Sequence, residues 1–331
     1  MRTPTTTLLR NNEVKSGQAS EQLDVRVRAI QWEADSVVSL VLISLHGGTL
    51  PEWQPGAHVD VQLSTDLSRS YSLSGDPRNR LSYRISVGLE DAGRGGSAFV
   101  HQSVHAGDVL TISCPKSNFE FVDAEAYLFL AGGIGITPLL PMITLAEARG
   151  RPWRLSYAVP SRDVMPFSHE LGLYGSTVGV YASDEGSRLS LFDHIRNTDT
   201  STAIYCCGPE RMIDEAEQIA SAVGQRVRTE RFRGAKLAPA RREGAFEVRC
   251  ARSAKTVTVN PDDSVLDALE ANGIPVVSSC REGACGTCEL TVLHGEVDHR
   301  DSILSPEEKQ ANETMMVCVS RAVSEELELD V

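Results

Sequence analysis

Four cysteines near the end of the 331-residue chain have the spacing of an iron–sulfur ligand set. Cys280, Cys285 and Cys288 form a C-x4-C-x2-C run, and Cys318 follows after twenty-nine intervening residues. Plant-type [2Fe–2S] clusters are held by four thiolates with this run. Thiolates are soft, anionic ligands. The spacing therefore predicts a cluster that transfers one electron at a time.

A structural zinc site is the alternative for the same cysteines. Such sites usually contain two C-x2-C pairs. Here a single pair follows a cysteine five residues upstream, and Gly283 and Gly286 lie within the run. Glycine adopts positive φ without strain, which suits a loop that folds tightly round a cluster. The loop favours iron–sulfur over zinc. His294 and His299 lie nearby, and we expect them at the surface because all four cysteine ligands are present.

Two segments of the N-terminal half are suited to an anionic, aromatic ligand. On a strand, Arg69 would pair with phosphate, Tyr71 would pack on a ring, and Ser70 and Ser72 offer hydroxyls. In the second segment, Gly93–Ser97 (GRGGS), the glycines lead into a short helix, whose free N–H groups would favour phosphate. A flexible turn is the plain alternative for the second segment.

A third segment predicts a nucleotide site. The apolar strand at Tyr127–Leu130 runs into a glycine-rich turn that contains Gly132, Gly133 and Gly135. We expect Thr137 to be the N-cap and Pro138 the first residue of a helix that ends near Gly150. This places a helix N-terminus at the carboxyl edge of a strand, where open α/β sheets bind ligands. Arg162 follows the next strand, where it could accept a 2′-phosphate or stack on adenine.

The elements around these motifs predict three domains. Period-two alternation and turn signals predict a β-barrel at 23–122. Alternating strands and helices predict a parallel α/β domain at 123–233. Residues 234–244 form a basic linker with Ala and Pro, and a hairpin and a helix capped by Ser264 precede the cysteine loop in a domain at 245–331. The polar residues 1–22 are expected to be a disordered leader.

The net charge of −13 is unevenly distributed. The segment from Glu243 onward carries 18 acidic and 7 basic residues. Nucleic acid is therefore an unsuitable partner, and the acidic domain serves either solubility or steering toward a basic protein. The sequence has no run of eighteen apolar residues and no signal-peptide core, so we expect no membrane span and a reducing cytoplasm. Nothing calls for more than a monomer.

The order of these motifs resembles the phthalate dioxygenase reductase family, including vanillate demethylase reductases. The resemblance covers about residues 23–331 and rests on RSYSL, GRGGS, the nucleotide turn and the cysteine run. It implies a multidomain β + α/β + α+β protein: a flavin-binding antiparallel β-barrel, a nucleotide-binding α/β domain and a C-terminal β-grasp ferredoxin domain. It assigns FMN to the barrel, although the wider superfamily often uses FAD. The implied FMN residues are Arg69, Ser70, Tyr71, Ser72, Val87, Gly95, Gly96, Ser97 and Phe232.

The same resemblance extends to the pyridine nucleotide. Cys207 and Gly208 would lie near the nicotinamide, and Phe232 would lie against the flavin until nicotinamide displaces it. The implied NAD residues are Gly132, Gly133, Gly135, Thr137, Arg162, Cys207, Gly208 and Pro209. NADH is favoured and NADPH stays open. The alternative for Phe232 and Cys206 is that they are ordinary core residues.

These features predict an NADH-dependent reductase component of a Rieske-type oxygenase that acts on an aromatic acid or ether. Hydride and electron transfer would be carried out by the cofactors, without a catalytic side chain. The chain has no oxygenase motif, so oxygen activation belongs to a partner. One alternative is a reductase for another acceptor, such as a quaternary-ammonium monooxygenase. An alternative of another class is a zinc-stabilised module that senses nucleotide without turnover.

Overall fold

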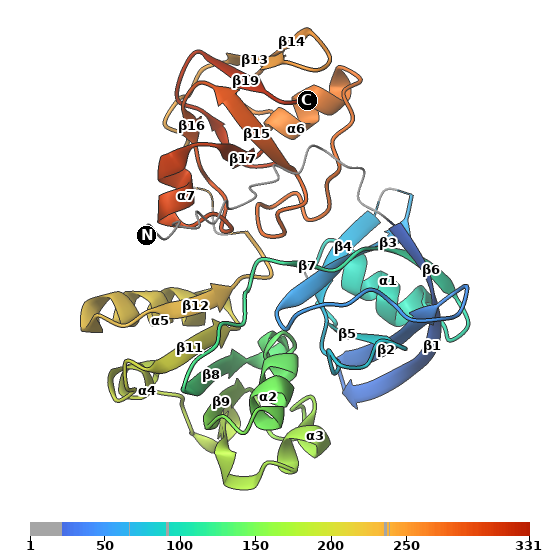
Figure 1. Cartoon of the computed structure of the whole chain (residues 1–331), viewed down its shortest axis with the longest axis vertical. Coiled ribbons are helices and arrows are strands. Elements are labelled where there is room, and N and C mark those ends of the chain that lie inside the picture. The colour runs from blue at the N-terminus through green and yellow to red at the C-terminus, as the bar shows by residue number, and fades with distance from the viewer. Residues whose placement is uncertain (1–21, 66, 91–92, 235–236, 238) are drawn as a thin grey trace, which may run out of the picture.

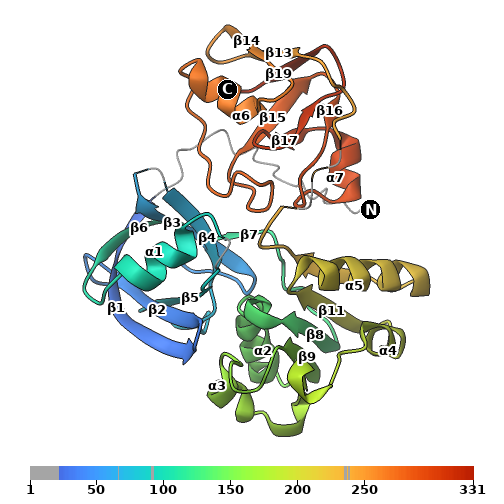
Figure 2. The ribbon, with the colours of Figure 1, turned by 180° about the vertical axis from the view of Figure 1, so that it is seen from behind.

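The computed structural model describes residues 22–65, 67–90, 93–234, 237 and 239–331. They form three domains that meet at a central junction, with the C-terminal domain lying across the other two (Figures 1 and 2). The predicted leader lies outside the described residues apart from Gln22, and the predicted linker is described only in part. No helix in the described ranges is long and apolar enough to cross a membrane.

The N-terminal domain is an antiparallel barrel. Its strands are ordered β4-β3-β6-β1-β2-β5, with β7 paired to β3, and a bridge between Leu73 and Ile85 joins the two edges. Alternate residues of β1, such as Val25 and Val27, are buried in its core. The helix α1 (Gly96–Ser103) follows β5. The strands are β1 (Gln22–Ala34), β2 (Val37–Ser44), β3 (Ala57–Ser64), β4 (Leu67–Ser72), β5 (Tyr83–Gly88), β6 (Val109–Ser113) and β7 (Lys116–Ser117).

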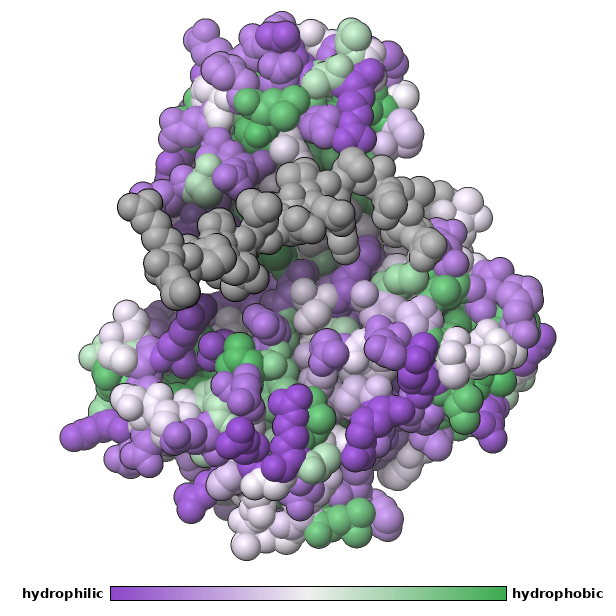
Figure 3. All heavy atoms as spheres, viewed as in Figure 1, coloured by the Kyte–Doolittle hydropathy of each residue, from purple (hydrophilic) through white to green (hydrophobic). Residues whose placement is uncertain are grey.

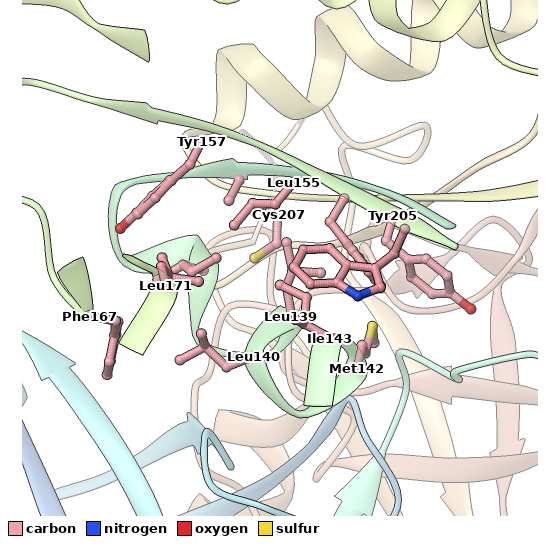
Figure 4. Close-up of a cluster of buried hydrophobic side chains, with 14 of the residues drawn as sticks. Leu139, Leu140, Met142, Ile143, Leu155, Tyr157, Phe167, Leu171, Tyr205 and Cys207 are labelled. Atoms are coloured by element: carbon pink, nitrogen blue, oxygen red, sulfur yellow. The ribbon is translucent and has the colours of Figure 1, made fainter. Parts of the chain in front are cut away.

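The second domain is a parallel sheet ordered β10-β9-β8-β11-β12, with helices on both faces. Side chains of α2 pack on one face, as Figure 4 shows, and side chains of α4 and α5 pack on the other. The strands are β8 (Ala126–Gly132), β9 (Trp153–Val159), β10 (Val178–Ala182), β11 (Thr202–Cys207) and β12 (Val227–Glu230). The helices are α2 (Leu139–Ala148), α3 (Ser168–Gly172), α4 (Leu191–Arg196) and α5 (Glu210–Val223), with short 3-10 turns at Gly133–Ile136, Gly175–Thr177 and Ser183–Glu185.

The C-terminal domain is a mixed sheet ordered β14-β13-β19-β15-β17. The predicted hairpin is β13 (Phe246–Cys250) and β14 (Lys255–Val259), and β19 (Glu326–Leu329) runs parallel to β13 but antiparallel to β15 (Glu289–His294). Ser264 caps α6 (Val265–Ala271), as predicted, by accepting a hydrogen bond of 3.0 Å from the N–H of Asp267. The remaining elements are β16 (Val297–Asp298), α7 (Pro306–Ala311), β17 (Thr314–Met316) and β18 (Arg321–Ala322).

This architecture confirms the predicted fold class: an antiparallel β domain, a parallel α/β domain and a mixed β-grasp domain. On the face drawn in Figure 3, hydrophilic side chains predominate and hydrophobic groups form small, scattered patches. The functional residues predicted from the sequence belong to all three domains, so the junction decides whether they meet.

Candidate functional site

A cavity of about 240 Å³ opens where the three domains meet. From the barrel it is lined by the predicted residues Arg69, Ser70, Tyr71, Ser72, Val87, Gly96 and Ser97. Phe232 and Thr137 from the α/β domain also line it, as does Glu282 from the cysteine loop. Gly95 does not line the cavity, but it is the N-cap of α1 and has a φ of 81°. The fold thus brings two separated barrel motifs to one wall.

The polar end of this cavity suits a phosphate. The guanidinium of Arg69 is held by hydrogen bonds to the carbonyls of Ser68 (2.7 Å) and Arg94 (2.6 Å). A Cβ on Gly96 would lie 2.5 Å from Cγ of Arg69, so glycine lets the start of α1 approach the arginine. Among the residues that the structure describes, no side chain caps the first turn of α1, so its N–H groups can bind an anion.

The other side of the cavity suits a flat, uncharged ring. Burial raises the pKa of Tyr71 to about 12, so its phenol stays neutral. Val87, which lines the same cavity, is almost fully buried, and Phe232 is 42 % exposed. An exposed aromatic side chain at a cavity between domains is free to be displaced by an incoming ring. Phosphate-binding and ring-binding features therefore meet in one cavity, as a flavin requires.

A buried carboxyl, which the sequence did not reveal, lies behind the same wall. Ser72 donates a hydrogen bond of 3.2 Å to Oε2 of Glu230, the last residue of β12. Burial raises the pKa of Glu230 to about 8, so this carboxyl is protonated at neutral pH. In the sequence Glu230 stands in a run of charged residues, and only the packing of β12 against the barrel turns it inward.

The glycine-rich turn differs from the expected helix start. Gly133–Ile136 form a 3-10 turn, and Pro138 rather than Thr137 is the N-cap of α2. The hydroxyl of Thr137 donates to the carbonyl of Ile134 (3.0 Å), so it does not cap the helix. Thr137 lines the flavin-type cavity instead of a nucleotide site. Gly135 is needed for packing, because a Cβ there would lie 2.4 Å from the carbonyl oxygen of Cys207.

A second cavity, of about 630 Å³, lies at the carboxyl ends of β8 and β9. Gly132, Gly133 and Pro209 line it, as do Arg188 and Arg211, which the sequence analysis missed. The signal for these two arginines was their position, one in the loop after β10 and one in the first turn of α5. A pyridine nucleotide carries phosphates, and arginine is the side chain best suited to pair with them.

Five of the eight predicted nucleotide residues do not line this second cavity: Gly135, Thr137, Arg162, Cys207 and Gly208. Arg162 donates to Glu185 (2.9 Å) on the exterior. Cys207 is fully buried among Leu139, Leu155 and Ile143 (Figure 4), and burial raises its thiol pKa. Gly208 packs against Gly132, with a Cβ at Gly208 reaching 3.0 Å from the Gly132 backbone.

The cysteine loop brings its four thiols together. Cys280 interacts with Cys285 and Cys318, and Cys318 interacts with Cys288. The N–H groups of Glu282 (3.3 Å) and Ala284 (3.5 Å) point to the sulfur of Cys280. Gly283 and Gly286 have φ of 70° and 77°, as predicted for a loop that wraps its contents. Backbone donors to sulfur and four buried cysteines fit a [2Fe–2S] cluster.

A third cavity, of about 70 Å³, separates the flavin-type cavity from the cysteine loop. Arg69, Ser72 and Phe232 line it on one side, and Cys280, Ala284 and Cys285 on the other. Buried His58 also lines it, and burial lowers the pKa of that imidazole. A small gap of this kind between two redox sites suits direct electron transfer.

The two histidines near the loop differ from each other. His294 is exposed, as predicted. His299 was wrongly placed at the surface: its side chain is 7 % exposed and its Nδ1 lies 4.0 Å from Oδ2 of Asp301. Neither histidine replaces a cysteine in the ligand set.

Comparisons with known proteins agree with this geometry. The family model for the 2Fe-2S iron-sulfur cluster binding domain matches residues 248–323, which supports the cluster over the zinc alternative. The chain is 40% identical over 314 residues to phenoxybenzoate dioxygenase subunit beta of Ectopseudomonas oleovorans, covering 93% of this chain and 97% of that protein. It is 35% identical to the carnitine monooxygenase reductase subunit of Escherichia coli (strain K12), covering 94% and 99%.

A solved structure agrees over the same length. Phthalate dioxygenase reductase, described as a modular structure for electron transfer from pyridine nucleotides to [2Fe–2S], superposes with a TM-score of 0.69 at 32% identity. The match covers 94% of this chain and 98% of that one. The chain therefore belongs to the phthalate dioxygenase reductase-like family, the NAD(P)H-dependent flavin and [2Fe–2S] reductase components of oxygenase systems.

Proposed function

We propose that the chain carries electrons from NADH through FMN to its [2Fe–2S] cluster and on to a Rieske-type oxygenase that acts on an aromatic acid or ether. The observation that carries this proposal is the series of three cavities from the glycine-rich turn, through the flavin-type cavity, to Cys280 and Cys285. A chain that only sensed nucleotide would need neither the second site nor the third.

Each cavity has a distinct task in this scheme. Arg188 and Arg211 hold the phosphates of the dinucleotide, while Gly132 and Gly133 let it approach the backbone. Arg69 and the start of α1 hold the flavin phosphate, and Tyr71 and Val87 support its ring. When bound, flavin accepts two electrons as a hydride from nicotinamide and delivers them one at a time to the cluster. Phe232 covers the ring until nicotinamide takes its place.

The residues around the ring position and protect rather than react. Ser72 and protonated Glu230 form a neutral hydrogen-bonded pair, so this carboxyl adds no charge beside the flavin. The thiol of Cys207 is buried and keeps its proton, which leaves it as packing under the turn.

The choice of FMN rests on the resemblance of RSYSL and GRGGS to the family motifs and on the cavity that they form. The choice of NADH rests on the family resemblance. The arginine pair in the nucleotide cavity is also compatible with the extra phosphate of NADPH, but Glu215 lines the same cavity and would repel added negative charge. The acidic C-terminal domain supports a partner with a basic docking surface.

A second acceptor has an observation in its favour. The reductase subunit of the Escherichia coli carnitine monooxygenase matches over nearly its whole length, with 35% identity. A monooxygenase of a quaternary ammonium compound is therefore the alternative partner. The chain never contacts the final substrate, so the cofactor sites are expected to be the same in both cases.

The deciding experiment is the visible spectrum of the purified protein before and after anaerobic NADH. Flavin and iron–sulfur bands that both bleach would support the relay, and chromatography of the released flavin would separate FMN from FAD. A colourless protein that contains zinc would overturn the proposal. Electron delivery to a purified aromatic oxygenase and to a carnitine oxygenase would separate the two acceptors, and salt should slow delivery to the true partner.

A further inference from the structure

The cysteine loop is fastened to the flavin barrel by hydrogen bonds that reach its backbone and side chains at separate points. We propose that Asp60, Arg94 and Asn118 of the barrel form a polar clamp that positions the [2Fe–2S] loop for electron transfer from the flavin. The inference rests on the proposed function and adds residues to it for which the sequence predicted no such role. Their partners lie at three places along the loop: Cys280 and Glu282, Cys285, and Thr287.

Arg94 makes the first contact and joins the two redox sites. Its Nη1 donates to the carbonyl oxygen of Cys280 (2.7 Å), and its Nε lies 3.1 Å from the carboxylate of Glu282. Its own carbonyl accepts from Arg69, the phosphate-binding arginine. A fixed positive charge therefore holds the first cluster ligand at the edge of the flavin cavity. The ion pair is partly exposed, so the hydrogen bond to Cys280 is the stronger half of this contact.

Asn118 makes the second contact at close range. Its side-chain amide donates to the carbonyl of Cys285 (3.1 Å). A Cβ on Gly286 would lie 2.9 Å from the same amide nitrogen. The glycine therefore serves the contact with the barrel as well as the turn of the loop. Asn118 itself is exposed and packs into no core.

Asp60 makes the third contact from a buried position. Its Oδ2 accepts from the hydroxyl of Thr287 (2.8 Å) and from Lys116 (3.1 Å), and its Oδ1 accepts from Ser70. Burial opposes its charge, but Lys116 and these hydrogen bonds outweigh burial, and the pKa of Asp60 lies below its ordinary value. A charged carboxylate is a strong acceptor. It ties the strand that binds the flavin to the residue before Cys288.

These contacts explain why Cys280 and Cys285, rather than Cys288 and Cys318, border the gap to the flavin. The contacts are polar, directional and few, so they determine orientation more than they add stability. Loss of one of the three contacts would let the loop tilt. Loss of two would let the C-terminal domain separate from the barrel for part of the time.

The test uses the holoenzyme with Asn118→Ala and Thr287→Val, singly and combined, because neither residue lines the flavin cavity. Stopped-flow absorbance would follow flavin and cluster separately after anaerobic NADH. Flavin reduction is expected to keep the wild-type rate. Electron transfer to the cluster is expected to slow by about tenfold in the double variant, since hydrogen bonds to charged or well-placed acceptors are worth about that factor. Small-angle X-ray scattering of the same protein should show a larger radius of gyration.

Two further variants complete the design. Arg94→Lys should retain part of the rate that Arg94→Gln loses, because the charge stays while the guanidinium fork is lost. Arg249→Gln is the control. It removes an exposed arginine that pairs with Glu326 within the C-terminal domain, away from the barrel, and it should change neither the rate of electron transfer to the cluster nor the scattering. Wild-type cluster reduction and scattering in the double variant would overturn the clamp, as would equal slowing of both steps. If NADH could not reduce the cluster of the wild-type protein, the proposed function would be overturned instead.

Discussion

The hydroxyl of Ser72 and the carboxyl of Glu230 lie 3.2 Å apart, Oγ to Oε2, across the boundary between the barrel and the α/β domain. Ser72 ends β4, which carries the motif proposed to bind flavin, and Glu230 ends β12 at the edge of the parallel sheet. Two residues separated by 158 positions thus meet beside the flavin-type cavity. Burial raises the pKa of this carboxyl more than the hydrogen bond from Ser72 lowers it.

Glu230 gives the folded protein a specific pH dependence. Its pKa is raised from 4.5 to about 8, so the folded state keeps a proton that the unfolded state releases in this interval. The stability contributed by this group is full below about pH 4.5 and is lost as the pH rises through 8. Denaturant unfolding at pH 6 and pH 9 should therefore show a smaller pH effect for Glu230→Gln than for wild type. Glu296→Gln changes an exposed carboxylate and should show the same pH effect as wild type. A Glu230→Gln protein with the wild-type pH effect would contradict the raised pKa of Glu230.

Cys318 is expected to be essential for the cluster although it lies outside the run. Cys318→Ser should lower bound iron and acid-labile sulfide to a small fraction of wild type, because the fourth thiolate is missing. Flavin content should be unaffected, since Cys318 lies away from the flavin cavity. Cys250→Ala is the matched control, as it removes a buried cysteine of the same domain that belongs to no ligand set. A full iron complement in Cys318→Ser would refute the ligand assignment.

Arg69 is expected to hold the flavin through its phosphate. Arg69→Gln should raise the flavin dissociation constant by about tenfold or more, since a charge-assisted hydrogen bond to phosphate contributes at least that factor. Fluorescence titration of the apoprotein with FMN would measure it. Arg80→Gln removes a barrel arginine that pairs with Glu52 outside the cavity, so its affinity should equal that of wild type. Equal losses in both variants would point to general destabilisation.

The nucleotide cavity distinguishes arginines that the sequence treats alike. Arg188→Gln and Arg211→Gln should each raise the KM for NADH several-fold, because both residues line the cavity. Arg162→Gln should leave it unchanged, as that side chain pairs with Glu185 on the exterior. Steady-state reduction of a dye acceptor would compare the three. Loss of NADH affinity confined to Arg162→Gln would restore the interpretation made from the sequence.

The sequence by itself determined the local parts of this protein. The cysteine run, the RSYSL strand and the capping of α6 by Ser264 each depend on residues a few positions apart. Backbone geometry over such short distances follows from residue type and spacing, so their chemistry could be predicted without a structure. The three-domain order followed from changes in periodicity along the chain.

Only the tertiary structure decided which residues these local parts contact and which side chains are buried. The inward carboxyl of Glu230, the burial of His299, the pairing of Arg162 with Glu185 and the contact between Asp60 and Thr287 join residues whose neighbours come from other elements. Thr137 shows the same limit, because a 3-10 turn at the end of β8 moved the N-cap from Thr137 to Pro138 and the first helical residue from Pro138 to Leu139. Burial and charge pairing depend on packing between distant segments, and no periodicity in the sequence records which segments will meet.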